Sequence, residues 1–399
     1  MAVKPTTLLL ALACLPAVTL VVDAVAGGRE PIEVASTPPD AESDDQGTRY
    51  APLVSTDTAV VEVGLEALAQ APDSVESERP VDSLVAEASD PVISETADST
   101  VVEPTPARNW VLRMSGTPSA RAGHALAFDR TRRGAVMFGG MTPSGLLGDT
   151  WTWSLRGWAQ LGSEDGPAPR AEHALAYHGG SQQVILFGGR TEDGVTSDTW
   201  SWDGERWSQL TTEGGPPDRS SHAIVYDGER ELLILFGGLN ASSGLLNDTW
   251  EFDGASWSRH LVVAPPAARE GHAMAYDEVR KRLVLFGGTG VDGETLDDTW
   301  EWDGETWVEQ QPSAKPTPRA GHSVAFDAQE GGVVVFGGAD GESLKDAWRW
   351  DGVAWTELVT VETPTARAAS AMVFDHNRGR LVLFGGTAGG ADTWELRRP

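Results

Sequence analysis

Six arginines repeat along the C-terminal part of the chain at intervals of 49, 49, 50, 50 and 48 residues. They are Arg121, Arg170, Arg219, Arg269, Arg319 and Arg367. Guanidinium groups bind carboxylates bidentately, so a ring of them could hold an acidic ligand. Six aspartates recur with a similar period and could instead neutralise the arginines within the protein: Asp149, Asp198, Asp248, Asp298, Asp346 and Asp392. The pattern therefore has two interpretations, an anion-binding site or a set of structural ion pairs.

Histidines follow five of the arginines at a constant distance. They are His124, His173, His222, His272 and His322, and Ser370 takes the sixth position. A ring of histidines could suggest a metal, but metal ligands must converge on one point and repeat-related residues are held apart. We therefore expect no metal site and no cofactor. The alternative role for these histidines is hydrogen bonding to backbone between neighbouring repeats.

Tryptophans also repeat, often as pairs separated by one residue, such as Trp151 and Trp153 or Trp300 and Trp302. Residues i and i+2 of a strand lie on one face, so such pairs suit packing between sheets. Stacking on a sugar is the second interpretation. No repeat stands out by extra polar residues, whereas a catalytic site normally breaks such regularity. The sequence therefore singles out no catalytic residue.

One repeat shows the elements that position these side chains. Residues 272–277 alternate as a strand, and Arg282–Phe286 is an apolar run that ends at Gly287-Gly288. A second alternating strand, Asp298–Trp302, is followed by the turn dipeptide Asp303-Gly304 and by a fourth strand from Trp307 to Gln310. Four antiparallel strands, here named a to d, form one blade of a β-propeller.

Gly-Gly pairs recur with the same intervals as the arginines, and all 16 tryptophans lie within the repeats. A period near 50 with a double glycine and a later tryptophan resembles the kelch repeat, over residues 109–399. The resemblance implies an all-β, six-bladed kelch-type propeller. It places the arginines at the channel mouth, on the face shared by the b–c and d–a loops. In some kelch proteins, equivalent arginines bind acidic peptides.

The two ends of the repeat region complement each other. The last repeat stops after strand c, at Asp392–Leu396, and the segment Asn109–Met114 precedes the first repeat. Trp110 precedes Arg121 by 11 residues, close to the 12 between the strand-d tryptophans and the next arginine. We therefore expect an N-terminal strand to complete the last blade. Such closure removes exposed sheet edges and sets the number of blades at six.

The b–c loops are the only connections whose length varies, so we expect a binding module that uses the b–c/d–a face. The alternative is a carbohydrate-active enzyme, such as a sialic-acid mutarotase or a glycosidase-like propeller. A kelch-type copper oxidase needs a cysteine–tyrosine crosslink, and the one cysteine, Cys14, lies in the N-terminal apolar stretch. The ligand, whether protein or carbohydrate, is unknown, and we expect a monomer.

The N-terminal part differs in composition from the repeats. Lys4, an apolar run over residues 8–22 and the small residues Ala24 and Ala26 are typical of a signal peptide over residues 1–26. A retained anchor or lipidation at Cys14 are the alternatives. Residues 27–108, with 18 acidic and 4 basic residues, are typical of a disordered linker. The net charge of −29 argues against nucleic-acid binding. We expect a protein of the cell envelope or one that is secreted, with no transmembrane domain after cleavage.

Overall fold

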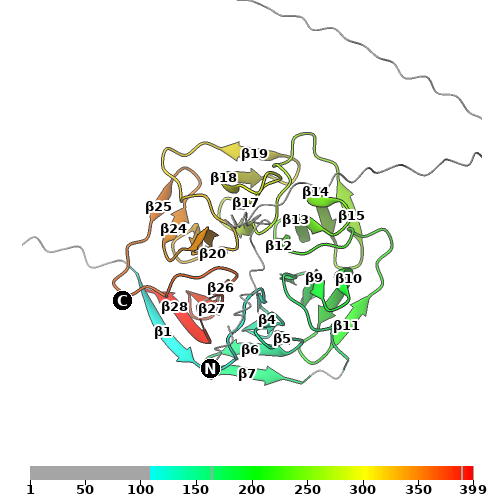
Figure 1. The fold of residues 1–399 in the computed structure, drawn as a ribbon, viewed down its shortest axis with the longest axis horizontal. Helices are drawn as coiled ribbons and strands as arrows, with labels where there is room; N and C mark the ends of the chain where they lie inside the picture. Colours follow the sequence, from blue (N-terminus) through cyan, green and yellow to red (C-terminus); the bar gives the residue numbers. More distant parts are fainter. Residues whose placement is uncertain (1–107, 163–164, 388–389, 399) are drawn as a thin grey trace, which may run out of the picture. The chain divides into compact units, whose positions relative to one another are not determined.

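The computed structural model describes residues 108–162, 165–387 and 390–398. In these ranges the chain forms strands and no helix, and six four-stranded antiparallel sheets surround a central channel (Figure 1). The predicted six-bladed propeller is therefore confirmed. No helix long and apolar enough to cross a bilayer occurs among the described residues. The predicted signal peptide and all of the predicted linker except Arg108 lie outside them.

Each blade runs from strand a at the channel to strand d at the rim (Figure 1). The a strands are β2 (Ala125–Asp129), β8 (Ala174–His178), β12 (Ala223–Asp227), β16 (Ala273–Asp277), β20 (Ser323–Asp327) and β26 (Ala371–Asp375). The b strands are β3 (Gly134–Phe138), β9 (Gln183–Thr191), β13 (Leu232–Asn240), β17 (Arg282–Thr289), β21 (Gly332–Phe336) and β27 (Arg380–Phe384).

The c strands are β6 (Thr150–Ser154), β10 (Gly194–Trp202), β14 (Gly244–Phe252), β18 (Thr295–Trp302), β24 (Ala347–Trp350) and β28 (Asp392–Arg397). The d strands are β7 (Gly157–Leu161), β11 (Trp207–Leu210), β15 (Trp257–His260), β19 (Trp307–Gln310), β25 (Trp355–Glu357) and β1 (Asn109–Ser115). Two short hairpins, β4 (Met141–Thr142) with β5 (Gly145–Leu146) and β22 (Ala339–Asp340) with β23 (Glu342–Ser343), form the b–c loops of blades 1 and 5.

The predicted strands of the fourth repeat match the structure with two differences. Strands b and c are longer than expected, because pairing resumes beyond the glycines, from Gly288–Leu296 to Thr289–Thr295. Strand a, β16, begins at Ala273, one residue later than expected, and the repeated arginines precede it. They therefore lie in the d–a connections, at the end of the channel where the b–c loops also lie.

The predicted closure by the N-terminal strand is confirmed. β1 pairs antiparallel with β28 at the rim of the last blade, with Trp110 opposite Leu396 (Figure 1). Trp110 is fully buried and packs edge-on against Phe336 of blade 5, with ring centroids 5.2 Å apart. The first and last described strands thus pair within one four-stranded sheet, and β1 covers the outer edge of β28.

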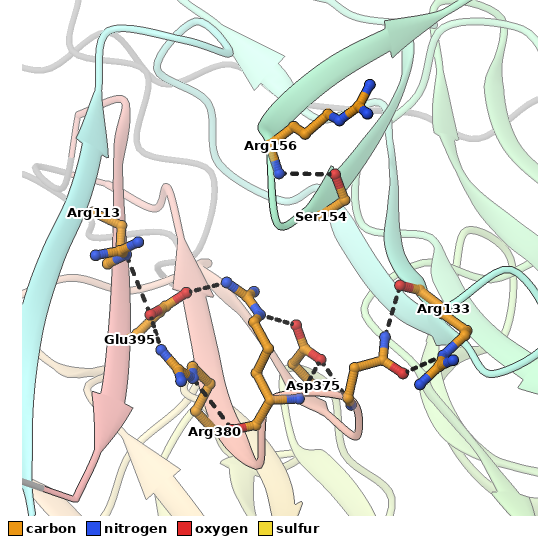
Figure 2. A network of polar contacts seen from close by, with 9 residues as sticks. Arg113, Arg133, Ser154, Arg156, Asp375, Arg380 and Glu395 are labelled. Atoms are coloured by element: carbon orange, nitrogen blue, oxygen red, sulfur yellow. Dashed lines mark hydrogen bonds and ion pairs between the residues drawn. The ribbon is translucent and has the colours of Figure 1, made fainter.

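A polar network strengthens this seam (Figure 2). The carboxylate of Glu395 in β28 is fully buried and lies 3.3 Å from Arg113 of β1. Arg378 and Arg380, from the a–b connection and β27 of the same blade, donate to the same carboxylate at 2.6 and 2.8 Å. One buried acid therefore connects the N-terminal strand to the rest of its blade, and three arginines offset the cost of burying it.

The Gly-Gly pairs allow neighbouring blades to approach closely. Gly139 and Gly140 have φ values of 63° and 100°, which glycine adopts readily. A Cβ on Gly139 would lie 2.5 Å from the carbonyl oxygen of Arg170 in the next blade. The Gly140 amide donates to that same oxygen at 2.8 Å. Any side chain at the first glycine would therefore separate two blades.

Candidate functional site

The six arginines are buried, and each is bound to the aspartate of its own blade. In blade 3, Arg219 donates to the two carboxylate oxygens of Asp248 at 2.7 and 2.8 Å and to the Gly237 carbonyl at 2.9 Å. Its Nε also donates to the Pro217 carbonyl at 3.2 Å. The other five arginines make the same set of contacts, and no arginine side chain of the six is more than 1% exposed.

Five of these aspartates, Asp149, Asp198, Asp248, Asp298 and Asp346, have a lowered pKa and are held in the ionised form. Burial by itself would raise the pKa of Asp248, but hydrogen bonds from Arg219 and from the Trp250 indole outweigh it and the pKa is lowered. A ligand carboxylate would have to displace an internal one at every arginine. Binding of a ligand by these arginines stays a prediction, and the geometry favours the alternative role of structural ion pairs.

The five histidines are buried beside the arginines. The ring of His272 lies edge-on to Phe236 of the preceding blade at 5.5 Å. Burial, and then the charge of Arg269, lower the pKa of His272 to about 3, so the ring is neutral. A contact to the backbone of Phe236 in the preceding blade partly opposes this lowering of the pKa. None of the ten ring nitrogens makes a hydrogen bond of normal geometry among the described residues, so the expected backbone hydrogen bonds stay a prediction. These rings act by packing between blades.

A closed belt of backbone hydrogen bonds surrounds the channel mouth. Its members lie two residues after each arginine, and each amide donates to the carbonyl of the preceding blade's member at 2.7–2.9 Å. All six have φ between 52° and 65°. They are Gly123, Glu172, Ser221, Gly271, Gly321 and Ala369. The ring of blades is therefore closed at the channel as well as at the rim.

The belt residues and the residue just before each of them determine which side chains are polar at the mouth. In the six blades these two positions read Ala-Gly, Ala-Glu, Ser-Ser, Glu-Gly, Ala-Gly and Ala-Ala. All four polar side chains, Glu172, Ser220, Ser221 and Glu270, thus fall in the adjacent blades 2, 3 and 4. At these two positions the mouth is therefore polar on one side, and the other three blades carry only alanine and glycine.

Contacts connect these polar side chains across blades. Arg190, in the b–c region of blade 2, donates to Glu172 at 2.7 Å, and the Ser221 hydroxyl lies 3.4 Å from the same carboxylate. Burial and the neighbouring Glu172 raise the pKa of Glu270. We name Glu172, Arg190, Ser220, Ser221 and Glu270 the polar cluster. It is the part of the mouth that departs from the sixfold repeat.

A cavity of about 410 Å³ lies over the alanine and glycine side of the mouth. The b–c loops of blades 4 and 5 form its wall, through Thr295 and Asp340, which are hydrogen-bonded at 2.5 Å. Its lining includes Glu172, Glu294 and Asp340 and contains no lysine, arginine, histidine or aromatic residue. The cavity therefore combines an apolar floor of small residues with an acidic margin.

Sequence reasoning missed this site, although a signal was present. The two residues between each repeated arginine and the following histidine or serine are the ones that vary at the mouth. The prediction that no repeat stands out by extra polar residues overlooked this variation. The polar residues that break the repeat pattern come from three different blades, and only closure of the ring brings them together.

Comparisons with known proteins agree with this architecture. Residues 203–386 match a family model described as the KLHDC2/KLHL20/DRC7 Kelch-repeats domain. The match and the six-bladed fold together support a kelch-repeat β-propeller family for this chain.

A solved structure described as "Structure of YjhT" resembles this kelch propeller with a TM-score of 0.55 and 18% identity. The match covers 71% of this chain and 96% of that one, and at this identity it supports the fold alone. The comparison with curated proteins finds no match.

Proposed function

We propose that this kelch propeller is a secreted or envelope-associated binding module that takes its ligand at the channel mouth, on the b–c/d–a face. The cavity beside the polar cluster carries this proposal, because it is where the otherwise regular repeat is broken. Ligand sites are concave, mostly apolar and supplied with a few placed polar groups, and the mouth has this composition. The signal-peptide pattern of residues 1–26 supports the proposed location.

The proposed site uses residues that the sequence did not single out. The arginines are saturated by internal acceptors, so the ligand would contact the belt, the polar cluster and the b–c loops of blades 4 and 5. These loops are among the connections whose length varies between repeats, and loops commonly carry binding residues on a rigid scaffold.

Filling the cavity tests the proposal. Ala320 lines the cavity, and Ala320→Phe should occlude it. Val279 is 69% exposed in an a–b connection on the opposite face, so Val279→Phe is the matched control. Ligands would be selected on the full-length protein from a phage-displayed random dodecapeptide library and from a glycan array. We expect their affinity to fall about tenfold or more with Ala320→Phe and to be unchanged with Val279→Phe.

Equal binding by all three proteins would reject the mouth as the site, and no enrichment from either library would reject the binding module. Urea unfolding of each variant would show that the fold is retained. Ala368→Leu, at the equivalent alanine of blade 6, would replace Ala320→Phe if the larger side chain prevents folding.

Carbohydrate chemistry is the second candidate function, and Glu270 favours it. A carboxyl group with a raised pKa beside a second carboxylate is a common source of acid catalysis in carbohydrate-active enzymes. Interconversion of sialic-acid anomers, followed by NMR, and release of nitrophenol from common glycosides would test it. Activity should disappear with Glu270→Gln, and no turnover by the unmodified protein would reject this function.

A further inference from the structure

We infer that the ligand of the channel mouth carries a cationic group, such as a lysine or arginine side chain of a peptide. This inference rests on the proposed function and names the class of ligand. The arginine ring predicted an acidic ligand. The inferred ligand has the opposite charge, because the arginines are buried while carboxylates line the mouth.

The charge of the cavity supports a cation. Glu172, Glu294 and Asp340 line it, and its lining contains no basic side chain. Arg190 neutralises Glu172 in part, but its own side chain is 46% exposed and could move toward solvent. A cationic ligand could then take its place. A ligand carboxylate would meet three like charges instead, which disfavours binding by several kcal/mol in typical interfaces.

The surroundings argue against two other ligands. In the described part of the chain no three histidine, cysteine, aspartate or glutamate side chains converge as metal ligands would. Sugars commonly stack on aromatic rings, and the cavity has none in its lining. Its apolar floor of alanine and glycine suits the aliphatic stem of a basic side chain, with the charged end at the carboxylates.

Peptide selection tests the inference. A random dodecapeptide library would be selected on the full-length protein at 0.15 M salt, where exposed charges are screened beyond about 8 Å. Peptides that also bind the Ala320→Phe variant would be removed. We expect lysine or arginine at one fixed position of the enriched peptides. Enrichment of acidic or neutral peptides would overturn the cationic ligand and leave the proposed function standing, whereas no cavity-dependent enrichment would overturn both.

Substitutions then separate specific recognition from general attraction to an acidic protein. With a synthetic enriched peptide, we expect Glu172→Gln to weaken binding about tenfold or more and Arg190→Gln to strengthen it, because the latter frees Glu172. Glu205→Gln and Arg206→Gln, on the exposed c–d turn of blade 2, are the matched controls and should change affinity little. Equal effects at the two sites would overturn the inference.

Discussion

At the scale of single residues, the arginines show how partners decide what a charged side chain can do. An ion cut off from water is destabilising unless hydrogen-bond acceptors surround it. Arg219 is 0% exposed and has four such contacts, two of them to the carboxylate of Asp248. Its charge is therefore used within the fold. The sequence allowed both this role and the ligand-binding role, because both need an arginine.

Removing the arginine should destabilise the fold, because it leaves a buried carboxylate without its counter-ion. We expect Arg219→Met to lower the free energy of unfolding by about 3–5 kcal/mol, since Asp248 would be left uncompensated. Arg206→Met is the matched control, because Arg206 pairs with Asp203 on the surface and is 81% exposed. It should change stability by less than about 1 kcal/mol. Urea unfolding followed by tryptophan fluorescence would measure both.

A double variant sharpens this prediction. Arg219→Met with Asp248→Leu should cost less than the sum of the two single changes, because it leaves no unpaired charge. Additive losses would show that the two groups do not act as a pair.

At the scale of elements, the strand-d tryptophans bind each blade to the one before it. In blades 1 to 5 the indole N–H donates to a strand-c threonine of the preceding blade at 2.8–3.2 Å. In the last blade the tryptophan is Trp110 of β1, and blade 5 has Ala347 where the other blades have threonine. The Trp110 indole therefore lacks a partner among the described residues. The seam of the ring is one hydrogen bond short.

Restoring the threonine should stabilise the seam. We expect Ala347→Thr to raise the free energy of unfolding by about 1 kcal/mol, the usual net contribution of a hydrogen bond. The same substitution in a Trp110→Phe background should give no gain, since the donor is absent. Urea denaturation midpoints of the four proteins would measure this, and an equal gain in both backgrounds would contradict the hydrogen bond as its cause.

At the scale of the whole molecule, five copies of one buried histidine make stability depend on pH. The folded protein keeps these rings neutral, with pKa values of about 3 for four of them and a strongly lowered value for His222. The unfolded chain has the ordinary histidine pKa of 6.5. Between these values the unfolded state binds more protons, so stability increases with pH.

We therefore expect the free energy of unfolding to fall steadily as the pH is lowered from about 6.5 toward 3. Each of the five histidines adds a slope of up to about 1.4 kcal/mol per pH unit. His272→Ser introduces the residue type that blade 6 has at the equivalent position, Ser370. It should reduce the slope by the contribution of one histidine, which is up to about 1.4 kcal/mol per pH unit. Urea unfolding at several pH values above 5, where the aspartates stay ionised, would measure it. A slope that His272→Ser leaves unchanged would contradict this account.

The repeat itself could be read from the sequence, because its signals are local. Glycine pairs, turn dipeptides and alternating strands recur every 48–50 residues, and each is set by contacts within a blade. The missing strand d after Leu396 and the extra tryptophan at position 110 were also visible, so the closure and the number of blades could be predicted. The length of strands b and c in blades 2–4 did not follow, since pairing beyond the glycines depends on how each b–c loop folds back.

The sequence by itself determined six blades, their strand order and the seam at Trp110. Only the tertiary structure decided that the arginines are internally neutralised and that the mouth is polar on one side. Glu172, Ser221 and Glu270 belong to different repeats, and their carboxylates and hydroxyl influence one another only because the belt brings the blades together at the channel. A periodic sequence specifies each blade separately, whereas a site at the axis of the ring depends on all of them at once.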